Sequence, residues 1–224
     1  MKRGFDILFA ASLLVVASPL FLLAAVGILV ASPGPVFYRA RRAGVGNRPF
    51  EMLKFRSMHV NQGGAVITSA GDARIFGFGK FLRKSKIDEL PQFLNVLTGD
   101  MSVVGPRPED PKIVDQHYTD WMMETLAVRP GITSPGAVFY YACAEDLVDS
   151  EDPEGSYVEK LLPPKLAVEM AYLQRANFVS DLFVIFHTAA AIVGEVIGRS
   201  VAPSDRDLQA ATRWVHAQAF DAIR

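Results

Sequence analysis

The chain has 224 residues, is 50% hydrophobic and carries a formal net charge of -1. This length fits one ordinary domain with a full core and a membrane element, and leaves little room for a second domain. A single cysteine, Cys143, excludes an internal disulfide and a multi-cysteine zinc site, and the four histidines show no metal-ligand spacing. We therefore expect one catalytic unit in a reducing, cytosolic setting.

The small net charge hides two segments of opposite sign. Residues 1–60 hold eight Lys or Arg against two Asp or Glu, whereas residues 109–160 hold twelve Asp or Glu against three Lys or Arg. The basic end is expected near anionic membrane lipids, and the acidic segment away from them. Because the positive charge follows an apolar segment, and no aromatic-rich basic face is present, nucleic acid is not an expected partner.

Residues 7–31 carry no charge. As a helix they would cover about 37 Å, more than a hydrocarbon core of about 30 Å, so their length permits a membrane span. Ser18-Pro19 interrupts the segment, because proline removes a backbone donor and the serine hydroxyl can bond a freed carbonyl. Basic residues lie on both sides, and the positive-inside preference pulls both ends to the cytoplasm. Two interpretations fit: a re-entrant helix-break-helix hairpin and a proline-kinked spanning helix.

Beyond this segment, the pattern changes to short strands and loops. Residues 50–56 alternate like a half-buried strand, which places Lys54 and Arg56 on the same face. The glycine-rich residues 61–71 predict a loop. A second apolar run, residues 178–198, contains charged and polar residues that would be costly at the centre of a bilayer, so it predicts a core helix or an interfacial amphipathic helix.

The most informative stretch contains two adjacent carboxylates, Asp88 and Glu89. Pro91 is tolerated in the first turn of a helix, so a helix over residues 90–97 is expected to begin near this pair. Backbone donors and the positive end of the helix dipole would then keep Asp88 ionised and attract phosphate, as a nucleophile toward phosphorus requires. The alternative interpretation is that the pair only caps the helix.

Cations surround this pair in the sequence. Arg83, Lys84 and Lys86 precede it, and Arg107 follows between Pro106 and Pro108. The rigid backbone at Arg107 suits a bidentate phosphate contact, although a structural salt bridge to the acidic segment is an equal alternative. Lys84 and Lys86 are expected to serve solubility or lipid headgroup attraction. Glu89 is a candidate magnesium ligand or proton acceptor.

These residues together resemble the bacterial sugar transferases known as monotopic phosphoglycosyl transferases. The resemblance runs in collinear order through most of the first 135 residues. It is carried by Lys2-Arg3 with Asp6, Ser18-Pro19, Gly34-Pro35-Val36-Phe37, Lys54-Phe55-Arg56-Ser57-Met58, Asp72 with Arg74, Phe81-Leu82-Arg83-Lys84, Asp88-Glu89-Leu90-Pro91-Gln92, Asn95-Val96-Leu97, Gly99-Asp100-Met101-Ser102, Gly105-Pro106-Arg107-Pro108 and Arg129-Pro130-Gly131-Ile132-Thr133.

The resemblance implies a mostly helical α/β fold. A re-entrant hairpin over residues 1–34 would lead into one cytosolic catalytic domain over residues 35–224, with interfacial amphipathic helices, at the cytoplasmic face of the bacterial inner membrane. A homodimer is compatible with it. The implied activity is the first membrane step of glycan synthesis, such as that of an exopolysaccharide, O-antigen or glycoprotein.

The resemblance also implies a mechanism and a set of site residues. Asp88 would attack the β-phosphorus of a UDP-sugar, release UMP, and pass the phosphosugar to a polyprenol phosphate such as undecaprenyl phosphate. Asp88 and Glu89 would be the catalytic pair and would bind Mg²⁺. The residues expected to contact substrate are Lys54, Arg56, Arg83, Pro106, Arg107, Pro108 and Glu169.

Three positions depart from the family pattern. Ala40 replaces a usual Gln, Ser134-Pro135-Gly136 replaces the usual continuation after Arg-Pro-Gly-Ile-Thr, and Glu169 replaces an expected Asp. The departures leave the carboxylate pair intact and concern the sugar pocket and the role of Glu169. They motivate an alternative function, a catalytically inactive membrane-attached scaffold or regulator of glycan assembly.

Overall fold

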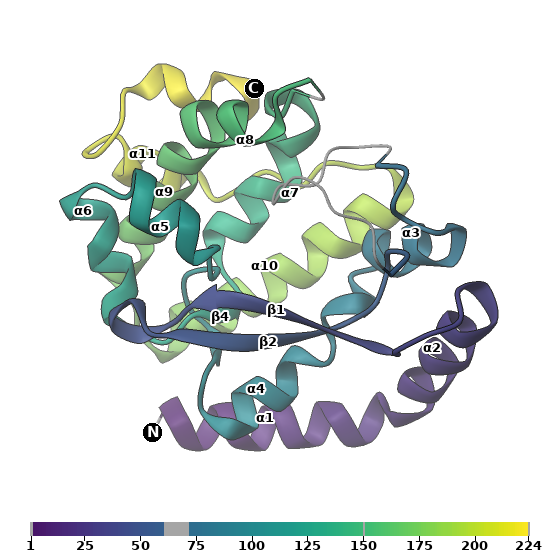
Figure 1. The fold of residues 1–224 in the computed structure, drawn as a ribbon. Coiled ribbons are helices and arrows are strands. Elements are labelled where there is room, and N and C mark those ends of the chain that lie inside the picture. The colour runs from purple at the N-terminus through teal and green to yellow at the C-terminus, as the bar shows by residue number, and fades with distance from the viewer. Residues whose placement is uncertain (1, 61–71, 150, 224) are drawn as a thin grey trace.

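The computed structural model describes residues 2–60, 72–149 and 151–223, and the loop predicted over residues 61–71 lies outside the described residues. Helices dominate and surround two small two-stranded sheets (Figure 1). The predicted class, a mostly helical α/β fold, is confirmed. In Figure 1 the first helix runs along the bottom of the view, and helices near the C-terminus gather at the top.

The N-terminal segment forms two helices, α1 (Lys2–Val16) and α2 (Ser18–Ala31), with a bend of 61° between them. Pro19 has no N–H to donate to the carbonyl of Val15, four residues earlier. The Ser18 hydroxyl donates to that carbonyl instead, over 2.8 Å. The serine therefore takes up the carbonyl that the proline frees, as the sequence predicts.

Most large apolar side chains of α1 and α2 are exposed. They are Ile7, Leu8, Val15, Val16, Leu20, Leu22, Leu23, Val26, Leu29 and Val30. The side facing the rest of the protein buries only Asp6, Ala10, Ala24 and Ile28. An apolar surface of this extent marks a membrane or protein interaction site. By length and composition, α1 and α2 together could cross a membrane, and so could helix α10 (Phe178–Ile197).

An antiparallel hairpin follows, made of β1 (Phe37–Ala43) and β2 (Pro49–Phe55), with Phe37 opposite Phe55. The 3-10 turn η1 (Val45–Asn47) joins the strands. The side chain of Asn95 binds the free side of β2, accepting from the N–H of Leu53 and donating to the carbonyl of Glu51, both over 2.8 Å. This contact fixes the distance between β2 and the helix that carries Asn95.

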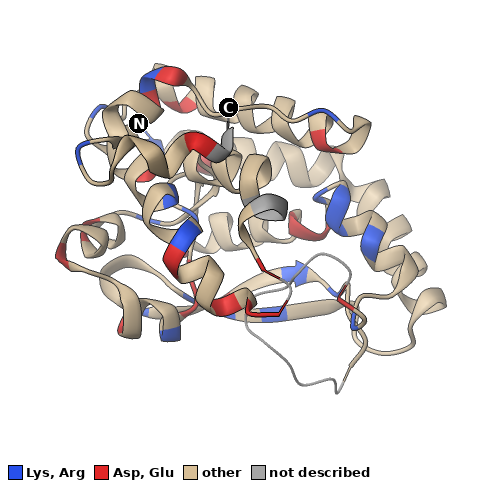
Figure 2. Ribbon diagram, turned by 90° about the horizontal axis from the view of Figure 1, so that it is seen from above, with Lys and Arg blue, Asp and Glu red and all other residues tan. Residues whose placement is uncertain are grey.

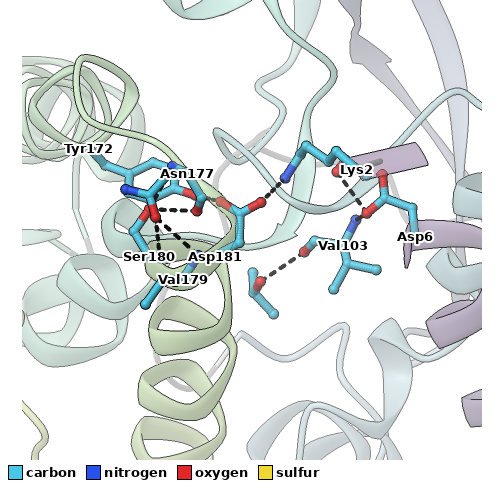
Figure 3. Close-up of polar contacts among 10 residues, drawn as sticks. Lys2, Asp6, Val103, Tyr172, Asn177, Val179, Ser180 and Asp181 are labelled. Carbon is cyan, nitrogen blue, oxygen red and sulfur yellow. Dashed lines mark hydrogen bonds and ion pairs between the residues drawn. The ribbon is translucent and has the colours of Figure 1, made fainter. Parts of the chain in front are cut away.

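The second sheet pairs β3 (Ser102–Val104) in parallel with β4 (Gly131–Thr133). Gly105 and Gly131 lie so close that a Cβ atom on Gly131 would collide with the backbone of Gly105, and a Cβ atom on Gly105 would collide with the carbonyl of Arg129. The buried carboxylate of Asp6 accepts a hydrogen bond from the backbone N–H of Val103 over 3.1 Å (Figure 3). It also accepts one from the Ser102 hydroxyl over 3.0 Å. These bonds attach α1 to the second sheet.

The C-terminal half of the chain is helical. Its elements before and after α10 are α5 (Pro111–His117), α6 (Asp120–Met123), η3 (Glu124–Ala127), α7 (Pro135–Leu147), α8 (Pro153–Ser156), the π-helical η4 (Tyr157–Leu161), α9 (Leu162–Leu173), α11 (Asp205–Ala211) and η5 (Ala217–Ile223). Helix α9 is buried along nearly its whole length and packs with α7 and α11 around Phe139, Leu166 and Ala167. This core supports the segment that follows β3.

Helix α10 has two different faces. Its buried positions are Asp181, Val184, Thr188, Ala191 and Gly194, which recur every three or four residues. Its exposed apolar residues are Phe178, Val179, Phe183, Phe186, Val193, Val196 and Ile197. The division agrees with the amphipathic helix predicted for this run, with one face against the protein core.

The two basic residues at the N-terminus bind protein groups. Lys2 forms an ion pair with Asp181 of α10, and the Tyr172 hydroxyl donates to the same carboxylate (Figure 3). Arg3 donates to the carbonyls of Val96 and Leu97, at 2.6 and 3.1 Å. The start of α1 is therefore attached to the globular part of the chain, and not only available to lipid headgroups.

We predict that Asp6→Ala destabilises the protein by about 2–3 kcal/mol, because the Val103 N–H and the Ser102 hydroxyl would lose a charged acceptor while buried. In a chain of this size, the midpoint of thermal unfolding in detergent would fall by roughly 5 °C or more. Asp120→Ala, at an exposed position, is the control and should leave the midpoint nearly unchanged. Equal midpoints for the two variants would contradict the proposed attachment of α1.

Candidate active site

The carboxylate pair lies in a short 3-10 turn, η2 (Ile87–Glu89), between α3 (Gly77–Lys84) and α4 (Gln92–Thr98). The sequence placed the pair at the cap and first residues of the following helix, and this placement is wrong by about one turn. Helix α4 begins after Pro91, without a hydrogen bond from a capping side chain. The alternative that the pair only caps this helix therefore has no support in the geometry.

Glu89 is held by two cations from different parts of the chain. Its carboxylate binds Lys54 Nζ of β2 over 3.1 Å. It also accepts hydrogen bonds from both terminal nitrogens of Arg107, one of them over 3.0 Å. Burial alone would raise the pKa of Glu89, but Arg107 and Lys54 outweigh it and hold the pKa well below its usual value. Glu89 is therefore a fixed anion with both oxygens engaged.

Asp88 has a different environment, although it is the adjacent residue. Its side chain is buried, and within the described part of the chain its Oδ1 atom has no hydrogen-bond partner. Burial raises the pKa of Asp88 to about 6, against the opposing charge of Lys54. The carboxylate of Asp88 is therefore still mostly ionised at pH 7, as predicted. Its pKa is nevertheless raised, whereas the N-terminus of a helix would lower it.

Arg107 lies in a strap formed by Pro106, Arg107 and Pro108, directly after β3. Both prolines are buried and the arginine is half-buried. Its guanidinium binds Glu89, so the carboxylate partner is a neighbour of Asp88 and not a residue of the acidic segment. Glu109, the residue that follows the strap, does belong to the acidic segment. It is bound by the buried Lys165 and by the Tyr157 hydroxyl.

Glu169 lies beneath this strap and is completely buried. Its Oε1 atom accepts from the Ser134 hydroxyl over 2.6 Å and from the backbone N–H of Arg107 over 3.2 Å. Burial raises the pKa of Glu169 to about 7. The carboxylate thus supports the backbone of Arg107 from inside the protein, a different position from the substrate contact that the sequence suggested.

Arg56 lies apart from the carboxylate pair. Its guanidinium donates to the carbonyls of Ser32, Pro35 and Met58, and to the Ser32 hydroxyl over 2.8 Å. The predicted shared face of Lys54 and Arg56 does not bring both to the site, because β2 ends at Phe55 and the chain turns. Arg56 instead fastens the exit of α2 to the end of β2.

Arg83 occupies the last turn of α3 and is half-buried. Its charge lowers the pKa of Asp88, against the larger effect of burial, which places the guanidinium in the electrostatic environment of the pair. The Arg83 side chain forms no hydrogen bond or ion pair among residues 2–60, 72–149 and 151–223. Of the predicted residues, the structure therefore groups Lys54, Arg83 and Arg107 around Asp88 and Glu89.

The sequence gives no clear signal for three further residues at the site, which are Lys86, Tyr141 and Glu195. Lys86, expected in solvent, lies with its Nζ 4.1 Å from the centre of the Tyr141 ring and 3.0 Å from a carboxylate oxygen of Glu195. Burial raises the pKa of the Tyr141 hydroxyl, so it remains a neutral donor. The ion pair of Lys86 and Glu195 joins residues more than 100 positions apart in the chain. Figure 2 shows that basic and acidic segments are interleaved along the whole ribbon.

The predicted magnesium ligands fit a metal only in part. The described residues contain no group of three or more His, Cys, Asp or Glu side chains able to hold an ion. Both oxygens of Glu89 are bound by Lys54 and Arg107, whereas the buried Oδ1 of Asp88 has no hydrogen-bond partner among the described residues. Mg²⁺ is commonly held by one or two carboxylates and by substrate phosphates, so Asp88 can supply one ligand beside a bound diphosphate.

Comparison with known proteins gives the family. The model of a family described as bacterial sugar transferase matches residues 1–195. The chain belongs to this family. The matched part of this sugar transferase contains the bent helix pair, the carboxylate pair, the Pro106–Pro108 strap and α10 as far as Glu195.

Several curated relatives are similar over most of the chain. A UDP-N-acetylgalactosamine-undecaprenyl-phosphate N-acetylgalactosaminephosphotransferase of Aeromonas hydrophila is 40% identical over 86% of the chain and 44% of its own length. A UDP-glucose:undecaprenyl-phosphate glucose-1-phosphate transferase of Caulobacter vibrioides is 36% identical over 86% of the chain and 69% of its own length. The exopolysaccharide production protein ExoY of Rhizobium meliloti is 32% identical over 85% of the chain and 84% of its own length.

Proposed function

We propose that this chain transfers a sugar 1-phosphate from a UDP-sugar to a polyprenol phosphate and releases UMP. One observation carries the proposal: of two adjacent buried carboxylates, Glu89 is saturated by cations, whereas Asp88 keeps an oxygen without a partner among the described residues. Neighbouring acids with pKa values moved in opposite directions are typical of divided catalytic roles. The names of the relatives, which specify UDP-sugars and undecaprenyl phosphate, support the substrate class.

In the proposed mechanism, a carboxylate oxygen of Asp88 attacks the β-phosphorus of the UDP-sugar. The bond from this phosphorus to the oxygen that bridges the α-phosphorus breaks, UMP leaves, and the phosphosugar stays on Asp88 as an acyl phosphate. A phosphate oxygen of the polyprenol phosphate then attacks the same phosphorus. This step forms a polyprenol diphosphate sugar and returns Asp88 to the free carboxylate.

The cations around the pair meet the main requirement of this chemistry, which is charge neutralisation and positioning. Lys54 and Arg107 already balance Glu89, so that carboxylate does not repel an incoming diphosphate as a free anion would. The Arg83 side chain has no observed partner in the described chain, is half-buried, and lies within electrostatic reach of Asp88. We assign the first phosphate contacts to Arg83 and to the remaining donors of Arg107 and Lys54.

We propose that Mg²⁺ assists the reaction when it enters with the nucleotide. Asp88 would hold it together with diphosphate oxygens, and Glu89 would remain bound to Lys54 and Arg107. The ion would neutralise charge that develops on the leaving UMP. Glu89 would then act by fixing the two cations beside Asp88, and not as a metal ligand.

We propose that α1 and α2 form a re-entrant hairpin at the cytoplasmic face of the bacterial inner membrane. Lys2 binds Asp181 and Arg3 binds the end of α4, whereas Ser32, just after α2, is held by Arg56. Both ends of the helix pair therefore contact the same globular unit, and a single crossing would separate them by a bilayer. In this position the product would enter bacterial glycan synthesis at its first membrane step.

We predict that Asp88→Asn lowers the rate of UMP release by at least about 1,000-fold, because an amide is a poor nucleophile toward phosphorus. The assay follows UMP from a panel of UDP-sugars, with undecaprenyl phosphate and Mg²⁺ in detergent. Asp120→Asn, at an exposed position, is the matched control and should retain full activity. Near-normal turnover by Asp88→Asn would eliminate Asp88 as the nucleophile, and UDP-sugar binding without UMP release by the unaltered chain would favour the inactive scaffold.

We predict that kcat/KM for UMP release falls about tenfold between pH 7 and pH 5, because the pKa of Asp88 is about 6 and only its ionised form attacks. Lys54 stabilises that ionised form, so Lys54→Gln should move the midpoint of the profile to higher pH, whatever its effect on the rate. A flat profile across this range, or a midpoint that moves to lower pH in Lys54→Gln, would contradict the assignment.

We predict that tags at the two ends of the chain can both be labelled only from the cytoplasm. The measurement compares a membrane-impermeant thiol reagent on intact and on opened cells, with single cysteines introduced in the tags. A Ser18→Ala, Pro19→Ala double variant removes the break and should shift part of the chains to a crossing topology. Labelling of the amino-terminal tag from outside in the unaltered chain would restore the spanning interpretation.

A further inference from the structure

Lys86 lies between α3 and the turn that carries Asp88. Its backbone is in the left-handed region, with φ of 54°, which is uncommon for a residue other than glycine. Its carbonyl accepts the N–H of Glu89 over 3.1 Å. The direction of the Lys86 side chain is therefore set by the same turn that positions the carboxylate pair.

The Lys86 ammonium is held by two groups from distant helices. Glu195 of α10 binds Nζ at 3.0 and 3.1 Å, and the ring of Tyr141 of α7 lies 4.1 Å away. The side chain of Lys86 is 17% exposed and that of Glu195 is 33% exposed, and the Oε2 atom of Glu195 is buried. Tyr141 would keep the cation in place if Glu195 moved away.

This ion pair lies between the apolar surface and the nucleophile. Glu195 is in the last turn of α10, where its neighbours Val193, Val196 and Ile197 are exposed. On the other side, the charge of Lys86 opposes the effect of burial on the pKa of Asp88, so the ammonium is within electrostatic reach of that carboxylate. A phosphate that comes from the lipid to Asp88 would pass this position.

The cations already assigned leave this second phosphate without a dedicated partner. Lys54 and Arg107 are bound to Glu89, and the phosphate that stays on Asp88 after UMP has left needs the donors that remain, with Arg83. Among the described residues Lys86 has a single carboxylate partner, and the side chain that carries it is one-third exposed. An anion with two or three charge-bearing oxygens can replace such a partner, since charge-assisted bonds to phosphate are at least as strong.

We propose that Lys86 binds the phosphate of the lipid acceptor, and that Glu195 holds the ammonium until this phosphate replaces it. The inference rests on the proposed function and names the residue that receives the second substrate. The competing explanation is a structural ion pair that only ties α10 to the turn. If Lys86 binds the acceptor phosphate, removing its charge weakens acceptor binding and removing the charge of Glu195 strengthens it. If the ion pair is only structural, removing either charge has a similar effect.

The test measures steady-state KM values for undecaprenyl phosphate and for the UDP-sugar that the unaltered chain uses, in the full-length protein in detergent. We expect Lys86→Gln to raise the KM for undecaprenyl phosphate about tenfold or more, and to change the KM for the UDP-sugar much less. We expect Glu195→Gln to lower the KM for undecaprenyl phosphate, because the ammonium becomes free. Lys84→Gln removes an exposed lysine two positions away and is the matched control, with both KM values close to those of the unaltered chain.

Other results would overturn the proposal in distinguishable ways. A larger increase in the KM for the UDP-sugar than in that for undecaprenyl phosphate in Lys86→Gln would assign the cation to the nucleotide side. Similar losses for Lys86→Gln and Glu195→Gln would show a structural pair. Thermal midpoints of all three variants separate these results from misfolding, since Glu195→Gln must fold to lower a KM. Absence of UMP release by the unaltered chain with every UDP-sugar would instead remove the proposed function, and this inference with it.

Discussion

The site depends on one buried electrostatic arrangement, the carboxylate of Glu89 between Lys54 and Arg107. These three residues come from a 3-10 turn, a strand and a proline-bounded strap, so the ion cluster fixes the relative positions of three elements. A buried charge without partners would be strongly unfavourable, and here the two cations compensate it. Lys54, with Arg83 and Lys86, also acts on the adjacent Asp88, whose Oδ1 atom has no hydrogen-bond partner among the described residues. The difference between two neighbouring carboxylates therefore follows from which of them the cations reach.

The same principle extends to the layer behind the cluster. Glu169 accepts the backbone N–H of Arg107, and Glu109 is bound by Lys165 and Tyr157, so buried acids hold the strap at its centre and just beyond its end. The close approach of Gly105 and Gly131 sets where the strap leaves the second sheet. The position of the Arg107 guanidinium is thus determined by main-chain contacts as well as by its own ion pair.

Local features of the fold could be predicted from the sequence, and contacts between distant segments could not. The break at Ser18-Pro19, the strand that carries Lys54 and the importance of Asp88 and Glu89 all depend on residues within a few positions of each other. The partners of Arg56, Lys86 and Glu169 depend on how α2, α10 and the strap pack in three dimensions. Lys86 shows this most clearly, because nothing in its neighbourhood in the sequence indicates that Glu195 and Tyr141 will bury it. The helix boundary near Asp88 was misplaced because a 3-10 turn and a first α-helical turn accept the same residues.

The amide of Asn95 has a consequence for how this chain behaves beside its own copies. A two-stranded ribbon presents unpaired backbone groups along each outer edge, and such edges recruit strands from other molecules. Asn95 occupies the N–H of Leu53 and the carbonyl of Glu51 just as an additional strand would. At this point a helical side chain closes the ribbon to a third strand, which protects the chain from edge-to-edge aggregation with its own copies.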